Sequence, residues 1–143
     1  MLHLRRIGLV VIGWSLGLCA ATAAADVVAV VSARNPVATM SKNQIANIFL
    51  GKTSHFPEGG QAVPIDQAEG AAAREEFYLN FTGKSPAQLK AHWAKIIFTG
   101  RGQPPLEVAN DAELKKRIAE NPNALGYIER TMVDDSVKVV LTP

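Results

Sequence analysis

The chain has 143 residues, with 15 Lys or Arg against 13 Asp or Glu and a formal net charge of +2. Residues 26–143 hold 13 basic and 13 acidic residues, so this part carries no net charge. Because it lacks a basic excess, it does not fit a nucleic-acid binder held by bulk charge, and we expect no nucleic-acid partner. Its high apolar content argues against a disordered chain, and its length favours a single domain.

The first 25 residues have the pattern of a secretory signal peptide. Residues 1–6 are short and basic, residues 7–18 are mostly apolar, and three alanines at 23–25 have the small-residue form that a signal peptidase requires. The apolar run is shorter than the ~20 residues that span a bilayer, which favours cleavage over a retained anchor. We therefore predict a signal peptide over residues 1–25, a domain over residues 26–143 and a periplasmic location.

Cys19 is the only cysteine. Leu18 precedes it, whereas lipoprotein signals resemble one another in carrying Gly, Ala or Ser at that place, so lipidation is the minor alternative. Cleavage after Ala25 leaves the domain without cysteine. Neither a disulfide nor a thiolate metal site is then expected.

The domain is predicted to begin with a buried strand and a capped helix. Residues 27–31 (VVAVV) form a continuous apolar run, which is typical of a strand covered on both faces. Ser41 and Gln44 have the spacing of a capping box, and Gly51 follows as the residue that ends the helix. The apolar face of this helix is predicted to hold Ile45, Ile48 and Phe49.

A second strand over residues 62–65 leads through a turn at 66–70 into a helix over 71–81. Pro64 indicates that this strand lies at an edge or that the proline stands at a strand end. Ser85 and Pro86 begin the next helix as its N-cap and first helical residue. The side chains predicted to point inward from these two helices are Ala73, Phe77, Phe81, Leu89, Trp93, Ile96 and Ile97.

The last third of the chain is predicted to add one helix and two strands. Residues 106–110 are interpreted as a turn or short helix, and Asp111 caps a helix that runs through residue 120. Residues 124–128 and 137–141 are the strand candidates. Strands that alternate with helices predict an α/β domain with a mostly parallel sheet flanked by helices.

The sequence shows no catalytic constellation. His55 and His92 lack the spacing that binds zinc. There is neither a nucleophile elbow nor a glycine-rich phosphate loop. We therefore expect no enzymatic activity, no catalytic residue, no metal and no cofactor.

The turn at residues 66–70 is the one segment whose predicted structure is typical of a ligand-binding site. It leaves a strand and opens directly into a helix, whose first backbone N–H groups have no partner within the helix. These groups lie at the positive end of the helix dipole and attract anions. Ligands of open α/β sheets bind beyond the carboxyl ends of the strands. The alternative is that Asp66 or Glu69 caps the helix with its own carboxylate.

Three segments resemble the substrate-binding proteins of phosphate ABC transporters. Residues 41–52 (SKNQIANIFLGK) are similar to the family's L-x-x-x-Q-L-x-x-I-F-x-G-K. Residues 62–77 resemble its strand followed by R-x-x-G-S-G-T-R-x-x-F, and residues 121–128 (NPNALGYI) resemble its N-P-G-A-I-G-Y-V. The resemblance implies a single lobe of the type II periplasmic-binding-protein fold. It also implies an exported solute-binding protein for phosphate or another small anion.

Departures from the family pattern weaken the implied site. Ala71, Ala72 and Ala73 stand where the family has Ser, Gly and Thr, and Gln67 stands where it has arginine. Each lost charge-assisted hydrogen bond corresponds to about 1.5–3 kcal/mol, so we expect weak binding. The ligand-binding residues that we predict are Gln67 through its side-chain amide, Gly70, Ala71, Ala72 and Ala73 through backbone N–H groups, and Arg74 through its charge. Ser32 and Arg34, which follow the first strand, are expected to line the same edge.

The family's members are two-lobed clamshells, usually more than twice as long as this chain. One lobe offers an open half-site, which a second lobe, a second protomer or the membrane component of an ABC transporter would complete. The alternative is a periplasmic interaction or accessory module that kept the fold and lost the ligand. An apolar patch near Phe56, Phe98 and residues 104–105 would favour that alternative.

Overall fold

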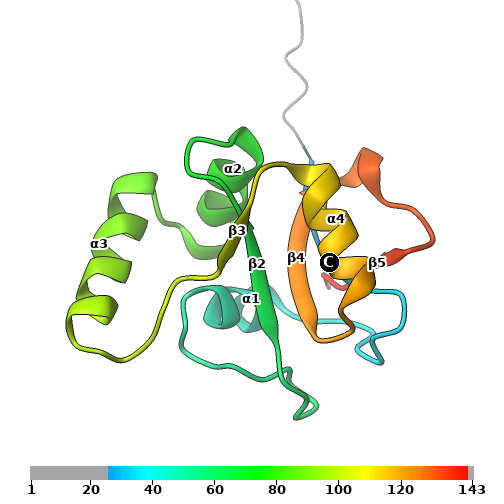
Figure 1. Cartoon of the computed structure of the whole chain (residues 1–143), viewed down its shortest axis with the longest axis horizontal. Coiled ribbons are helices and arrows are strands. Elements are labelled where there is room, and N and C mark those ends of the chain that lie inside the picture. The colour runs from blue at the N-terminus through cyan, green and yellow to red at the C-terminus, as the bar shows by residue number, and fades with distance from the viewer. Residues whose placement is uncertain (1–25, 142–143) are drawn as a thin grey trace, which may run out of the picture.

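The computed structural model describes residues 26–141, and the predicted signal peptide lies outside them (Figure 1). The strands are β1 (Val27–Ser32), β2 (Val63–Gln67), β3 (Leu106–Val108), β4 (Ala124–Glu129) and β5 (Val137–Val139). The helices are α1 (Lys42–Phe49), α2 (Ala72–Thr82), α3 (Pro86–Phe98), α4 (Asp111–Glu120) and the short 3-10 helix η1 (Arg130–Met132).

The five strands form one sheet in the order β3-β2-β4-β1-β5. β2 pairs in parallel with β3 and β4, whereas β1 pairs antiparallel with both β4 and β5. Four strands therefore run in one direction and β1 runs in the other. The predicted α/β lobe with a mostly parallel sheet is confirmed, with β1 as the exception.

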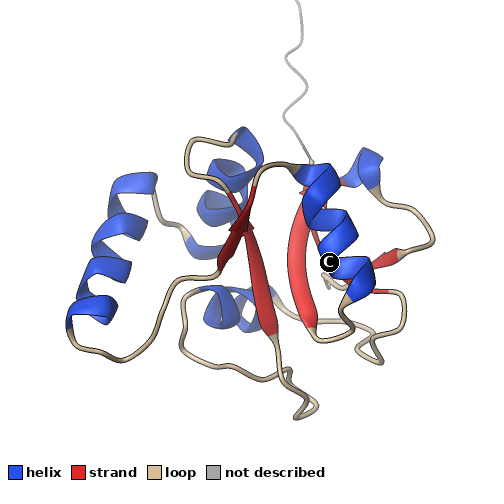
Figure 2. Cartoon of the chain, viewed as in Figure 1, coloured by secondary structure: helices blue, strands red, loops and turns tan. Residues whose placement is uncertain are grey.

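Helices cover both faces of the sheet (Figure 2). One buried cluster joins Ala29 and Val31 of β1 to apolar residues of α1 and α2, and the other joins Val28 and Val30 to α4. Alternate residues of a strand point to opposite faces. A strand buried on both faces must therefore be apolar throughout, which explains the unbroken valine-rich run predicted to be such a strand.

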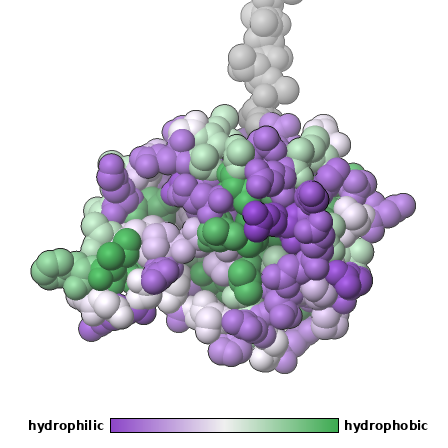
Figure 3. Space-filling model, viewed as in Figure 1, coloured by the Kyte–Doolittle hydropathy of each residue, from purple (hydrophilic) through white to green (hydrophobic). Residues whose placement is uncertain are grey.

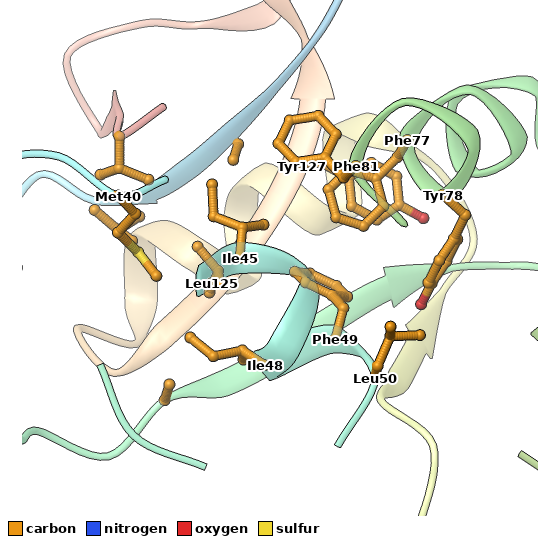
Figure 4. Close-up of a cluster of buried hydrophobic side chains, with 14 of the residues drawn as sticks. Met40, Ile45, Ile48, Phe49, Leu50, Phe77, Tyr78, Phe81, Leu125 and Tyr127 are labelled. Carbon is orange, nitrogen blue, oxygen red and sulfur yellow. The ribbon is translucent and has the colours of Figure 1, made fainter. Parts of the chain in front are cut away.

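An aromatic group fills the space between the sheet, α1 and α2 (Figure 4). The rings of Phe77 and Tyr127 are stacked, with centroids 4.1 Å apart and planes 6° apart. The ring of Phe49 meets Phe77 edge-on, with centroids 4.7 Å apart. These three side chains have no exposed surface, so they tie α1, α2 and β4 together.

The predicted helix starts are confirmed where a capping pattern was present. Ser41 and Ser85 both form capping boxes with the residue three positions later. Gly51 follows α1 with a φ of 74°, and a side chain there would also meet the Trp93 ring at 2.9 Å. Both the left-handed conformation and the close approach require glycine at this position.

Three sequence-based predictions of local structure are wrong. Residues 106–108 form the edge strand β3, not a turn or helix, because pairing with β2 orders a segment too short to show a period. Asn110 is the N-cap of α4, and Asp111 is its first residue. Ile97 is 54% exposed, since α3 buries only its Leu89 and Trp93 side.

α3 stands away from the sheet (Figure 1), and Leu89 and Trp93 are its buried residues. Trp93 packs against the chain at Gly51, and the His92 Nε2 lies 2.9 Å from the carbonyl oxygen of Leu50. These contacts anchor α3 at the end of α1.

Residues 26–141 contain the complete sheet and both buried clusters. A chain that begins at Asp26 therefore retains every contact described here and is suited to experiments. Within residues 26–141, every helix is too short or too polar to cross a membrane.

Candidate functional site

The start of α2 is the only one among the four α-helices in residues 26–141 that has no side-chain cap. Ser41, Ser85 and Asn110 cap α1, α3 and α4 through their side chains, whereas the N-cap of α2 is Ala71 and accepts no such bond. The alternative that Asp66 or Glu69 caps α2 is therefore wrong. The first-turn N–H groups of α2 keep their capacity to bind an anion.

Asp66 does not cap the helix because its carboxylate is used inside the protein. The residue is 1% exposed. Its Oδ1 accepts from the Gln67 backbone N–H at 2.8 Å and from the Tyr127 hydroxyl, and its Oδ2 accepts from the Tyr78 hydroxyl at 2.5 Å. Two tyrosines from different elements thus hold this carboxylate at the end of β2.

Burial raises the pKa of the Asp66 carboxyl, although hydrogen bonds from Tyr127 and Tyr78 and the charge of Arg74 act in the opposite direction. Burial and the adjacent Asp66 carboxylate also raise the pKa of both tyrosines. The phenols therefore stay protonated and remain hydrogen-bond donors at neutral pH.

The raised pKa of Asp66 predicts a particular pH dependence of stability. A carboxyl whose folded-state pKa lies above its ordinary value of 3.8 favours the folded state below that pH, and this contribution is lost as the pH rises through the folded-state pKa. Relative to Asp66→Asn, the wild type should therefore lose stability as the pH rises above about 4, by at most about 1.4 kcal/mol per pH unit. Urea unfolding at a series of pH values measures this difference.

Asp134 provides a control of opposite sign. Its hydrogen bonds from Lys115 and Ser136 lower the pKa of its carboxyl, so its stabilising contribution is present above the ordinary value and is lost as the pH falls. Relative to Asp134→Asn, the wild type should gain stability as the pH rises. Equal slopes for the two variants would contradict the assignment at Asp66.

Arg74 lies in the first turn of α2 and is held by three groups. Its Nη1 donates to the Glu107 carboxylate at 2.8 Å and to the Gln67 carbonyl oxygen at 3.1 Å, and its Nε lies 3.9 Å from the Asp66 Oδ1. The side chain is 15% exposed. A cation therefore stands at the predicted turn, but two carboxylates share its charge.

Gln67 is positioned differently from the sequence-based prediction. It is 3% exposed, and its side-chain Nε2 donates to the Asp111 carboxylate at the start of α4. The amide that we predicted to donate to a ligand is engaged within the protein. Residues 70–74 do lie together, but the Ala71 N–H donates to the Ala68 carbonyl oxygen at 3.1 Å, so the prediction that it donates to a ligand is wrong as well. The N–H groups of Gly70, Ala72 and Ala73 and the Arg74 side chain remain from the predicted set.

The expectation that Ser32 and Arg34 line the same edge is wrong. Because β1 runs antiparallel to β4, which is parallel to β2, the carboxyl end of β1 lies at the opposite end of the sheet from Gln67. There Arg34 donates to the carbonyl oxygens of Ala119 and Glu120 at 3.2 and 3.1 Å, at the end of α4. The Ser32 hydroxyl donates to the same Ala119 oxygen at 3.4 Å. These two residues therefore stabilise the C-terminal end of α4.

Sequence reasoning missed the partners that surround the turn. Glu107 comes from β3, which was not predicted as a strand, and the two tyrosines that bind Asp66 are distant in sequence.

A cavity of about 270 Å³ opens beside the turn, between α2 and α3. Its lining includes Gly70, Arg74, Tyr78, Leu89, Trp93 and Glu107. Within residues 26–141, no group of His, Asp and Glu side chains is arranged to hold a metal ion.

No protein-family model matches this sequence. Solved structures do share the fold. A phosphate ABC transporter substrate-binding protein from Clostridium perfringens, with bound phosphate, is 24% identical with a TM-score of 0.64, and the match covers 81% of this chain and 44% of that one. An ABC-type phosphate transport receptor from Vibrio cholerae is 20% identical with a TM-score of 0.63, covering 80% of this chain and 45% of the receptor.

PstS from Borrelia burgdorferi is similar as well, with 11% identity, a TM-score of 0.59 and coverage of 82% of this chain and 47% of PstS. The chain thus spans less than half the length of these solved structures. The resemblance to phosphate-transporter substrate-binding proteins is confirmed at the level of the fold, which is that of one periplasmic-binding-protein lobe.

Proposed function

We propose that the chain is an exported solute-binding protein that binds phosphate, or a similar small oxyanion, at the start of α2. The observation that carries this proposal is the uncapped first turn of α2 beside Arg74, at the carboxyl end of β2. Backbone N–H groups and a guanidinium are the usual ligands of an oxyanion. The shared fold of the phosphate-bound Clostridium perfringens protein supports phosphate as the first anion to test.

The surroundings of the turn predict weak binding. Ala72 and Ala73 contribute backbone donors only, because they carry no hydroxyl, and the Ala71 N–H already donates to the Ala68 carbonyl oxygen. Asp66 and Glu107 already neutralise Arg74, so an incoming anion competes with them. A dissociation constant in the millimolar range, equivalent to about 4 kcal/mol, is the expected outcome.

A phosphate titration followed by amide NMR tests the proposal on the chain that begins at Asp26. Saturable shifts confined to residues 70–74 and their neighbours are expected. Arg74→Gln should abolish them, while Arg34→Gln, which removes a cation at the other end of the sheet, should leave them unchanged. Absence of saturable shifts at tens of millimolar phosphate would reject the site.

A capping variant sharpens this test. Ala71 has the extended backbone of an N-cap, with φ −65° and ψ 130°, so the hydroxyl of Ala71→Ser can accept from a first-turn N–H of α2 without strain, as Ser41 and Ser85 do in α1 and α3. We expect phosphate to bind about tenfold more weakly, because the cap takes a donor whose hydrogen bond to a charged group is worth about 1.5–3 kcal/mol. Ala112→Ser, at an exposed position of α4, is the control. An unchanged affinity in Ala71→Ser would show that the anion does not lie at this turn.

Removing the competing carboxylate should strengthen binding. Glu107 is 47% exposed, pairs with Arg74 and lines the cavity with it. Glu107→Gln frees the guanidinium and removes a negative charge, so phosphate affinity is expected to rise severalfold, more at low than at high salt. Glu113→Gln, on the exposed side of α4, serves as the charge-matched control. An affinity that stays constant or falls would show that Arg74 does not contact the anion.

The second candidate function is an interaction module that kept the fold and lost the ligand. The engagement of the Gln67 amide by Asp111, and of Arg74 by Glu107, favours it. The apolar patch that we expected is only partly present, because Phe56 is buried and Phe98 is exposed. Its partner would be an ABC transporter membrane component, a second lobe or a second protomer. A failed phosphate titration would leave this candidate as the better one.

A further inference from the structure

The charges of the domain are strongly segregated around α3. Residues 82–101 contain four basic residues, Lys84, Lys90, Lys95 and Arg101, and no acidic residue. The rest of residues 26–143 contains nine basic and thirteen acidic residues, a net charge of −4. An anionic surface would therefore attract the α3 side and repel the remainder, which fixes one orientation of approach.

None of these four cations takes part in an ion pair within residues 26–141. Lys84 and Lys90 line the cavity between α2 and α3, where the carboxylates of Glu69, Glu75 and Glu107 face them. Lys95 and Arg101 are exposed and do not line this cavity, so they are the cations available to an outside surface.

The outer end of α3 also carries an exposed aromatic side chain. Phe98 is 92% exposed, whereas Ile97 is 54% exposed and lines the cavity between α2 and α3. Figure 3 shows apolar side chains at the left edge of the molecule, over the position of α3 in Figure 1. At 100° per residue, Phe98 lies about 140° around the helix from the buried Trp93 and about 60° from Lys95. The phenylalanine and this lysine therefore share the outward face.

We infer that the outer face of α3 binds the surface of an anionic lipid bilayer. Phe98 would enter the interfacial region, Lys95 and Arg101 would contact lipid phosphates, and Lys84 and Lys90 would add to the attraction at longer range. Interfacial helices combine an apolar residue with flanking lysine and arginine in this way. The end of α3 projects from the domain (Figure 1), and a projecting side chain suits a lipid interface, since a protein partner would have to provide a matching pocket.

Co-sedimentation with lipid vesicles tests the inference, using the chain that begins at Asp26 at low ionic strength. Vesicles of equal parts phosphatidylglycerol and phosphatidylcholine should carry the protein down, and vesicles of phosphatidylcholine alone should not. Each cation near an anionic surface strengthens binding about fivefold. Binding should therefore weaken as salt is added.

Matched variants locate the contact. Phe98→Ser should weaken vesicle binding about tenfold through loss of the inserted ring, whereas Leu79→Ser, at a residue of α2 that is 61% exposed, should have no effect. Lys95→Gln with Arg101→Gln should weaken binding at least tenfold, and the same charge change at the exposed Lys52 and Lys116 should weaken it much less. Circular dichroism confirms that each variant is folded.

Three results would overturn the inference: no sedimentation with anionic vesicles, equal sedimentation with both lipid compositions, or equal effects of the Phe98 and Leu79 substitutions. The first result would favour an acidic protein surface, in place of a lipid bilayer, as the partner of α3. Because vesicle binding is measured without phosphate, its outcome is independent of the phosphate titration.

Discussion

Replacing Phe77 with alanine is expected to lower the free energy of unfolding by about 3–5 kcal/mol. Phe77 is fully buried, stacks on Tyr127 of β4 at 4.1 Å and meets Phe49 of α1 at 4.7 Å. Truncation removes the apolar burial and leaves a cavity where α1, α2 and the sheet meet (Figure 4). A domain of this size has a total stability of about 5–15 kcal/mol, so this variant could lose most of its stability at 37 °C.

Urea unfolding of the chain that begins at Asp26 measures this effect, and Phe98→Ala is the matched control. The same chemical change at a side chain that is 92% exposed should alter stability by less than about 0.5 kcal/mol. A comparable loss in both variants would mean that the aromatic group is not the centre of the core.

Replacing Tyr127 with phenylalanine is expected to cost about 1.5–3 kcal/mol, the second-largest effect that we predict. The ring and its stacking on Phe77 are retained, so the packing is unchanged. What is lost is a hydroxyl that donates to the buried Asp66 carboxylate and accepts from the Gln67 backbone N–H at 3.1 Å. A buried carboxylate that loses a donor is left partly unsatisfied, and this is costly in a medium of low polarity.

A double-mutant cycle separates this cost from a general loss of packing. In the Asp66→Asn background the charged acceptor is absent, so the Tyr127→Phe substitution should cost less than half as much as in the wild type. Equal costs in the two backgrounds would show that the hydroxyl does not act through Asp66. Tyr78→Phe, which removes the other phenol bound to Asp66, provides an independent comparison.

Most of the helices and strands could be predicted because their signals are local. A capping box at Ser41, a serine before Pro86 and a left-handed glycine after α1 are each satisfied by neighbours within a few residues. The inward face of α2 followed from the helical spacing of Phe77 and Phe81. β3 was not predictable in this way, since its three residues are ordered by pairing with β2.

The candidate site likewise contains features with a local sequence signal and features without one. The turn before α2 and the position of Arg74 follow from the order strand, turn and helix, which the sequence contains, whereas the absence of a side-chain cap was decided by the structure. The engagement of Gln67 by Asp111, and of Arg74 by Glu107, joins residues 44 and 33 positions apart. Such contacts have no local signal, so sequence reasoning assigned both side chains to a ligand.

The sequence by itself determined the α/β class, the capped helices, the strand buried on both faces and the turn that leads from a strand into α2. These follow from periodicity and capping, which act over a few residues. Only the tertiary structure decided that β1 runs against its neighbours, which places Ser32 and Arg34 at the far end of the sheet from the turn. It also decided that Asp66 is held by two tyrosines and that Phe98 projects into solvent, because burial and long-range hydrogen bonding depend on how the elements pack.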